Sequence, residues 1–237
     1  MKNRITSILD KAIPIKILES YLESTGHLIQ IAKLGWGLSL VDKFLKERIE
    51  LYNSFGIKTS TGGTLFEYFY KKNEIEKFYE FIEFNNFQIC EISDGSIDIS
   101  QEEKLFHIKK TSEKWICLSE VGSKDTTVVM SPRKWCNQIK DELDAGASHV
   151  ILEGREAGNA GIYRESGEIR NGLIEEIIEF GINYEDLIFE ASHKNHQVSF
   201  LKRFGPNVNF GNIDISEVMS LETLRMGYRS DTLNFIK

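Results

Sequence analysis

The sequence predicts an α/β protein made of a single (βα)8 barrel of the TIM type that spans residues 1–237. Eight short apolar or β-branched runs alternate with longer amphipathic stretches, which is the order of successive βα units. No hairpin signal interrupts this order, and no Gly-x-Gly-x-x-Gly motif follows a first strand, so an open dinucleotide-binding sheet lacks its fingerprint. No Pro-rich or Gly/Ser-rich linker divides the 237 residues, and this length fits one barrel of roughly 250 residues.

Several of the eight strand candidates are apolar almost throughout, as strands of a buried parallel sheet are. Most are separated by roughly 20 to 40 residues, which leaves room for a helix between neighbours. The candidates are Ile5–Leu9, Leu28–Leu34, Ile57–Thr61, Phe87–Ile92, Trp115–Glu120, His149–Glu153, Leu187–Glu190 and Asn207–Phe210.

Helix candidates lie between these runs, and some carry clear start signals. Ser131 followed by Pro132 is typical of an N-cap and first helical position. Thr64-x-x-Glu67 and Ser100-x-x-Glu103 each predict a capping box. The predicted helices are Ile15–Glu23, Val41–Phe55, Phe66–Phe84, Gln101–Ser112, Pro132–Ala145, Leu173–Phe180, His196–Phe204 and Ser216–Gly227.

Composition excludes several classes of function. The formal net charge of −7 argues against a nucleic-acid partner, because such proteins bind mainly by neutralising phosphates. No apolar run approaches the roughly 18 residues of a membrane helix, and the N-terminus does not resemble a signal peptide. Cys90, Cys117 and Cys136 are far apart and lie in apolar surroundings, which predicts reduced core thiols. We therefore expect a cytoplasmic protein, and we also expect a homo-oligomer.

Acidic residues follow four successive strand candidates. Glu91, Glu120, Glu153 and Glu190 each end a run, and Asp94 follows the first of these runs closely. In a (βα)8 barrel these strand ends meet at one mouth, where the active site is built. Carboxylates converging there would repel one another unless a divalent cation or a group of Lys and Arg lay among them. Oxygen ligands of this kind suit Mg²⁺, so all five carboxylates are candidate metal ligands.

Basic residues and glycines at the same strand ends are candidates for binding an anion. Lys33 ends the second run, Lys124 follows Glu120, and Arg155 follows Glu153 with a guanidinium suited to carboxylate or phosphate. The pairs Gly62-Gly63 and Gly211-Asn212 could each present backbone N–H groups to a phosphate at a helix start. A tight strand-to-helix turn is the alternative for both pairs. His193 and His196 have helical spacing without a third ligand motif, which favours a helix N-terminal pair over a metal site.

Taken together, these strand ends resemble the phosphosulfolactate synthase family. The resemblance runs in collinear order over nearly the whole chain. It rests on the stretches Lys33-Leu-Gly-Trp-Gly37, Gly62-Gly-Thr-Leu-Phe-Glu67, Glu91-Ile-Ser-Asp-Gly-Ser96, Glu120-Val-Gly-Ser-Lys-Asp125, Gly205-Pro-Asn-Val-Asn-Phe-Gly-Asn-Ile213, Leu221-Glu-x-Leu-Arg225 and Arg229-Ser-Asp-Thr232. It implies a Mg²⁺-dependent (βα)8 lyase that adds sulfite to C3 of phosphoenolpyruvate and gives 2-phospho-3-sulfolactate. In methanogens this product feeds coenzyme M synthesis, and in some bacteria it leads to sulfolactate.

This reaction gives the basic residues provisional roles. Lys124 is expected to donate the proton that C2 needs, and Lys33 to bind the substrate phosphate or carboxylate, or else to form a buried ion pair with the strand-end glutamates. Arg155, Gly62, Gly63, Asn209, Gly211 and Asn212 are the expected substrate-binding residues. Two alternatives stay open: a barrel lyase that adds another nucleophile to an enol phosphate, and a non-catalytic stress or interaction member of the family.

Overall fold

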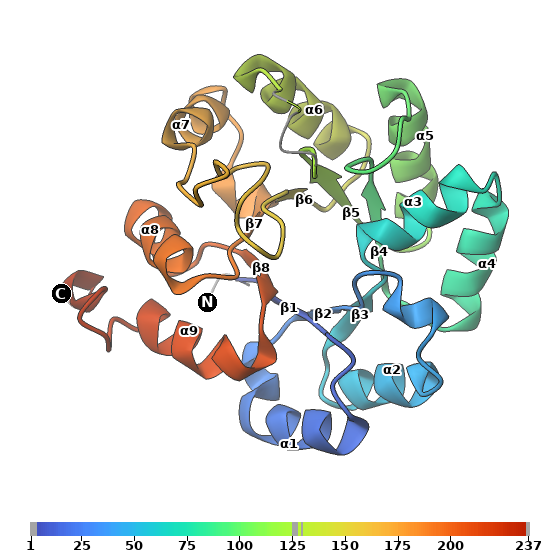
Figure 1. Ribbon diagram of the computed structural model, residues 1–237, viewed down its shortest axis with the longest axis horizontal. Coiled ribbons are helices and arrows are strands. Elements are labelled where there is room, and N and C mark those ends of the chain that lie inside the picture. Colours follow the sequence, from blue (N-terminus) through green and yellow to red (C-terminus); the bar gives the residue numbers. More distant parts are fainter. Residues whose placement is uncertain (1–3, 125–127, 129, 236–237) are drawn as a thin grey trace.

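A closed barrel of eight parallel strands forms the centre of the computed structural model, which describes residues 4–124, 128 and 130–235. Each strand pairs with the next in sequence, and β8 closes the ring against β1. Figure 1 shows the helices arranged around the outside of this ring. The strands are β1 Thr6–Leu9, β2 Ile31–Lys33, β3 Lys58–Ser60, β4 Ile89–Ser93, β5 Ile116–Val121, β6 His149–Leu152, β7 Leu187–Glu190 and β8 Phe210–Ile213.

The helices follow the predicted order with one difference. The prediction of a single helix over Phe66–Phe84 is wrong. The helix is interrupted between α3 and α4, where Asn73 adopts a left-handed φ of +56°. An amide side chain tolerates this conformation better than most, so Asn73 can end one helix and begin the next. The helices are α1 Ile15–Thr25, α2 Leu45–Ser54, α3 Gly63–Lys71, α4 Ile75–Phe84, α5 Gln101–Ser112, α6 Pro132–Asp144, α7 Asn171–Glu179, α8 Lys194–Phe204 and α9 Val218–Arg225.

Two of the predicted helix starts are confirmed in detail. The Ser100 hydroxyl accepts a hydrogen bond from the Glu103 N–H at the start of α5. The Ser131 hydroxyl does the same for the Lys134 N–H at the start of α6, with Pro132 in the first turn. Each side chain satisfies one of the amides that the first helical turn leaves without a partner.

The hydrophobic core has two layers, one on each side of the sheet. Outward-facing strand residues such as Cys90, Val150 and Phe189 pack against the helices. A smaller cluster comes from six different strand segments and fills the barrel interior; its members are Ile5, Ile31, Ile89, Leu118, Ile151 and Ile188. Cys117 and Cys136 are also buried free thiols, as predicted. No helix in the described parts of the chain is long and apolar enough to cross a membrane.

The eighth strand differs most from its prediction. It spans Phe210–Ile213 rather than Asn207–Phe210. The pairing of β1 with β8 matches Thr6 to Phe210 but Ile8 to Ile213, so β8 carries one extra residue and forms a bulge. Within it, Asn212 has a left-handed φ of +56°. Gly211 and Asn212 are residue types common in turns, so the sequence pattern ends the predicted strand before them, at Phe210.

Candidate active site

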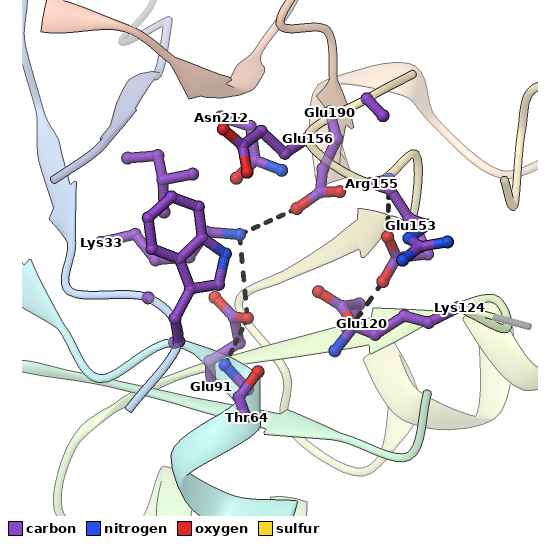
Figure 2. A pocket seen from close by; sticks show the side chains of 16 residues that line it. Lys33, Thr64, Glu91, Glu120, Lys124, Glu153, Arg155, Glu156, Glu190 and Asn212 are labelled. Carbon is purple, nitrogen blue, oxygen red and sulfur yellow. Dashed lines mark hydrogen bonds and ion pairs between the residues drawn. The ribbon is translucent and has the colours of Figure 1, made fainter. Parts of the chain in front are cut away.

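The mouth of the barrel holds a cavity of about 280 Å³ at the carboxyl ends of the strands. Lys33, Glu91, Glu120, Glu153 and Glu190 all line it, which confirms the prediction that they open onto one end (Figure 2). They share this orientation because side chains two positions apart in a strand lie on the same face. Each of these five residues lies two positions after a member of the interior aliphatic cluster, so that cluster is the floor and the charged side chains stand above it.

Lys33 is buried between two glutamates. Its Nζ lies 2.8 Å from Glu190 Oε1 and 4.0 Å from Glu91 Oε1. Burial by itself would lower the pKa of Lys33, but the charges of Glu190, Glu91 and Glu120 outweigh it and raise the pKa above its ordinary value. The ion-pair arrangement that the sequence left open is therefore present, and Lys33 is firmly cationic at the base of the cavity.

The Gly62-Gly63 turn fixes the start of α3 against β4. The Gly63 N–H donates a hydrogen bond of 2.6 Å to Glu91 Oε1. A Cβ at Gly63 would lie 2.4 Å from the Cβ of Ser93, and Gly62 has a left-handed φ of +68°, so both positions require glycine. Both glycines line the cavity, but the Gly63 amide binds a carboxylate of the protein itself.

Lys124 lies among three carboxylates on the other side of the cavity. Its Nζ is 3.3 Å from Glu120 Oε1, 3.5 Å from Glu67 Oε1 and 3.9 Å from Glu153 Oε2. Burial would lower its pKa, but Glu120, Glu153 and Glu67 together raise the pKa above the ordinary value. Lys124 thus keeps its proton at neutral pH while its side chain remains about a quarter exposed to the cavity.

Among the described residues, five carboxylates surround the two ammonium groups of Lys33 and Lys124: Glu67, Glu91, Glu120, Glu153 and Glu190. Burial raises the pKa of Glu91 to about 7, against the opposing charge of Lys33. Burial also raises the pKa of Glu153, helped by the negative charges of Glu120 and Glu190. Glu120 behaves oppositely, because Lys124 and Lys33 outweigh its burial and lower its pKa to about 2. The cluster therefore carries more carboxylate than its cations can neutralise.

The donor set fits a divalent cation of the Mg²⁺ type. One carboxylate oxygen on each of Glu67, Glu91 and Glu153 is buried and has no hydrogen-bond partner among the described residues. Such oxygens are the ligands that Mg²⁺ prefers. Within the described chain, no group of three or more His, Cys, Asp or Glu side chains is arranged to hold a metal ion by itself. A cation bound here would therefore complete its shell with water or substrate oxygens, as Mg²⁺ commonly does.

Arg155 and Asn212 lie at the rim of the cavity, both with a left-handed φ. The Arg155 backbone N–H donates to Glu153 Oε1 at 2.7 Å, and Arg155 as a whole is exposed. The β8 bulge carries Asn212 into the cavity lining, and its Oδ1 is buried without a hydrogen-bond partner in the described chain. Gly211 lies behind Asn212, and a Cβ there would be 3.2 Å from Ile188.

Three residues predicted for the site, Asp94, Asn209 and Gly211, do not line this cavity. Asp94 does not line the cavity; it is 2.8 Å from the Nζ of Lys104, a fully buried lysine that also contacts Glu142. Asn209 precedes β8 and binds backbone groups, accepting from the Ile5 N–H and donating to the carbonyls of Glu185 and Leu187. Because β8 begins at Phe210, Asn209 lies before the strand and not at its carboxyl end.

The capping box at Thr64-x-x-Glu67 is also absent. The N-cap of α3 is Gly62, without a side-chain hydrogen bond. Glu67 instead accepts hydrogen bonds from the Ser93 hydroxyl at 2.7 Å and the Ser96 N–H at 3.2 Å. The Ser93 hydroxyl also lies 2.9 Å from Glu120, so it bridges the two carboxylates.

Glu67, Ser93 and Trp36 are among the residues at or near the cavity that sequence reasoning did not assign to the site. For Glu67 a signal existed: it is a carboxylate among the buried residues Leu65, Phe66 and Phe69 of α3. Ser93 lies two residues after Glu91 in β4, so its side chain is on the same, inner face of the strand. His193, as expected, is the N-cap residue of α8, and the His196 ring stacks on Tyr163.

The fold and this mouth define a (βα)8 barrel whose small cavity is lined by buried carboxylates and lysines. A family model described as (2R)-phospho-3-sulfolactate synthase matches residues 1–231. This chain belongs to the phosphosulfolactate synthase family.

Curated relatives agree with this assignment. A phosphosulfolactate synthase of Methanocaldococcus jannaschii is 41% identical over 236 residues, covering 96% of this chain and 93% of the relative. The Bacillus subtilis phosphosulfolactate synthase is 36% identical over 227 residues, covering 95% and 90%. The Arabidopsis thaliana protein HEAT-STRESS-ASSOCIATED 32 is more distant, at 24% identity, covering 88% and 80%.

A solved structure supports the fold alone. The YdjI aldolase from Escherichia coli K12 superposes with a TM-score of 0.60 at 9% identity, covering 98% of this chain and 84% of the aldolase.

Proposed function

We propose that this protein is a Mg²⁺-dependent lyase that adds sulfite to C3 of phosphoenolpyruvate and forms 2-phospho-3-sulfolactate. The observation that carries the proposal is the mouth of the barrel, where Lys33 and Lys124 stand among Glu67, Glu91, Glu120, Glu153 and Glu190. Identities of 36% and 41% to curated phosphosulfolactate synthases support the same activity over the non-catalytic alternative.

The addition joins two anions and expels no leaving group. Sulfite sulfur forms a bond to C3, and the π electrons of the C2–C3 bond move toward the carboxylate as an enolate-like aci-carboxylate. A proton delivered to C2 completes the product. Lys124 is suited to deliver it, since it holds its proton at neutral pH and reaches the cavity with a partly exposed ammonium group.

Other residues would hold the substrate. The ammonium of Lys33 lies at the base of the cavity, and the guanidinium of Arg155 lies at the rim, so the two could bind opposite ends of a short anion. Asn212 offers a buried side-chain oxygen without a partner in the described chain, which suits a bound water.

The excess of carboxylates supports Mg²⁺ as the cofactor. Glu91 and Glu153, together with Glu67, are the residues that would hold it through their unpartnered oxygens, with Glu190 engaged by Lys33. When bound, Mg²⁺ would act as a Lewis acid toward the charge that develops on the substrate carboxylate. It would also offset the repulsion between the protein carboxylates and an anionic substrate.

The test is an incubation of the protein with phosphoenolpyruvate, sulfite and Mg²⁺, followed by mass spectrometry and ³¹P NMR. We expect phosphosulfolactate only when all three are present, and we expect it to form far more slowly when Lys124 is replaced. A reaction mixture containing Lys124→Ala protein is the matched negative control. Consumption of phosphoenolpyruvate with a different nucleophile but never with sulfite would instead identify the alternative lyase. No consumption under any condition would refute the enzyme proposal.

A further inference from the structure

The cavity has one apolar side. Many of its lining residues are charged or polar, but Leu9, the last residue of β1, and Trp36, in the loop after β2, also line it. Trp36 is the single aromatic residue in the lining contributed by the described residues. Its side chain is 54% exposed, so a large flat apolar surface meets solvent at the cavity.

The backbone holds Trp36 in an uncommon conformation. Its φ is +57°, a left-handed value that is costly for a bulky residue. Gly37 follows with a φ of +67°, and Gly35 precedes it so closely packed that a Cβ there would lie 2.6 Å from Leu9. Two successive left-handed residues turn the chain sharply after β2. Strained conformations of this kind persist where the surrounding structure holds them, and they concentrate at functional sites.

The other left-handed residues of the described chain show that this strain is not general. Asn73 and Asn86 follow helices, where asparagine is commonly found. Arg155 and Asn212, like Trp36, line the cavity. Left-handed residues other than glycine and asparagine are otherwise limited to Ala12, in the loop after β1.

The remaining tryptophans have clear structural roles. Trp135 is buried in the core, and Trp115 stacks on Tyr79 with ring centroids 6.0 Å apart. Neither lines the cavity. Trp36 has no ring contact of this kind in the described structure, so its exposed surface is available to a ligand.

We infer that Trp36 is a specificity-determining residue whose indole contacts the substrate and favours a planar three-carbon acid. The inference rests on the proposed function. In phosphoenolpyruvate, C2, C3 and the carboxylate are trigonal and can lie in one plane, so they can pack flat on an aromatic surface. In the sulfonated product C2 is tetrahedral, and the flat contact is lost when the carbon–sulfur bond and the C2 proton are in place. Trp36 would thus hold the substrate more tightly than the product and favour product release.

Two ligands of matched charge test this inference. Phosphoenolpyruvate and 2-phospholactate differ in whether C2 is planar or tetrahedral. Their dissociation constants are measured by calorimetry with Mg²⁺ and without sulfite, for wild type, Trp36→Phe, Trp36→Ala and the control Trp115→Phe. We expect wild type to prefer phosphoenolpyruvate, Trp36→Phe to keep most of this preference, and Trp36→Ala to lose about fivefold of it through weaker phosphoenolpyruvate binding.

Fluorescence supplies an independent measurement. Phosphoenolpyruvate should protect an exposed tryptophan from acrylamide quenching in wild type and in Trp115→Phe, but not in Trp36→Phe. If phosphoenolpyruvate binds wild type, yet Trp36 is not protected and Trp36→Ala keeps the full preference, the inference is overturned while the proposed function stands. If wild type binds no phosphoenolpyruvate at all, the proposed function fails, and the inference fails with it.

Discussion

Replacing Lys124 with alanine is the sharpest test of the mechanism. Its Nζ lies 3.3 Å and 3.5 Å from oxygens of Glu120 and Glu67. At an effective dielectric constant of about 20, each such pair attracts by about 5 kcal/mol before the cost of burial is subtracted. The neighbours therefore keep Lys124 protonated, as a proton donor requires. General acid catalysis typically contributes 10² to 10⁴ in rate, so we expect kcat of Lys124→Ala to fall by about a hundredfold or more.

Steady-state kinetics with phosphoenolpyruvate and sulfite separates this role from simple charge binding. Loss of a group that acts only in the transition state lowers kcat and leaves KM nearly unchanged. Lys124→Arg keeps the positive charge but cannot readily release a proton, so it should be almost as slow as Lys124→Ala. Lys114→Ala is the matched control, because Lys114 forms an exposed ion pair with Glu83. A rise in KM with unchanged kcat, or full rescue by arginine, would contradict the donor role.

Three further predictions follow from the buried charges. Mg²⁺ should bind weakly alone and more tightly with phosphoenolpyruvate present; calorimetric affinities that are independent of each other would refute a shared site. Lys104→Met should destabilise the protein by about 3–5 kcal/mol in urea unfolding, because it leaves Glu142 buried and without its cation, and the double variant with Glu142→Leu should recover part of the loss. Glu91→Gln should be more stable than wild type at pH 8, by about 1–3 kcal/mol in the presence of EDTA. The raised pKa of Glu91 means that the folded protein holds this proton more tightly than the unfolded chain, so wild type loses stability as pH rises from about 4.5 to about 7, and the advantage should vanish below that window. An advantage that does not change with pH would exclude this explanation.

Much of the fold could be predicted, because hydrophobic runs and helix caps are local features. The strand Leu187–Glu190 and the helix Gln101–Ser112 match their predictions at both ends. The errors arose where a tertiary contact overrides a local preference. Asn73 ends a helix in the middle of an amphipathic stretch, and the bulge in β8 is defined by pairing with β1, a strand some two hundred positions earlier in the chain.

The residues of the site that lie at strand ends could be predicted from the sequence, because alternate side chains of a strand face the barrel interior. Lys33, Glu91, Glu120, Glu153 and Glu190 needed only correct strand ends. Glu67 comes from a helix, and its approach to Ser93 depends on how α3 packs over β4, which no local pattern specifies. Asp94 was predicted at the site because it follows a strand end closely in sequence. In the structure it forms an ion pair with Lys104 instead.

A pattern repeated along the chain explains why the buried charges indicate function and not stability alone. An aliphatic residue, any residue and then a charged residue recur at the ends of β2, β4, β5, β6 and β7, from Ile31-Ala-Lys33 to Ile188-Phe-Glu190. Because side chains two positions apart lie on the same face of a strand, the aliphatic residue of each triplet is in the floor of the cavity and the charged residue lies above it. If these charges served only to stabilise the barrel, cations and anions would balance, because an unpaired buried charge is costly. Among the described residues, five carboxylates around two lysines leave the site under-neutralised, and burial accordingly raises the pKa of Glu91 to about 7 and the pKa of Glu153 above its ordinary value. The arrangement costs folding stability that aliphatic residues at the same positions would restore, and a bound cation with an anionic substrate is the natural means of relieving it.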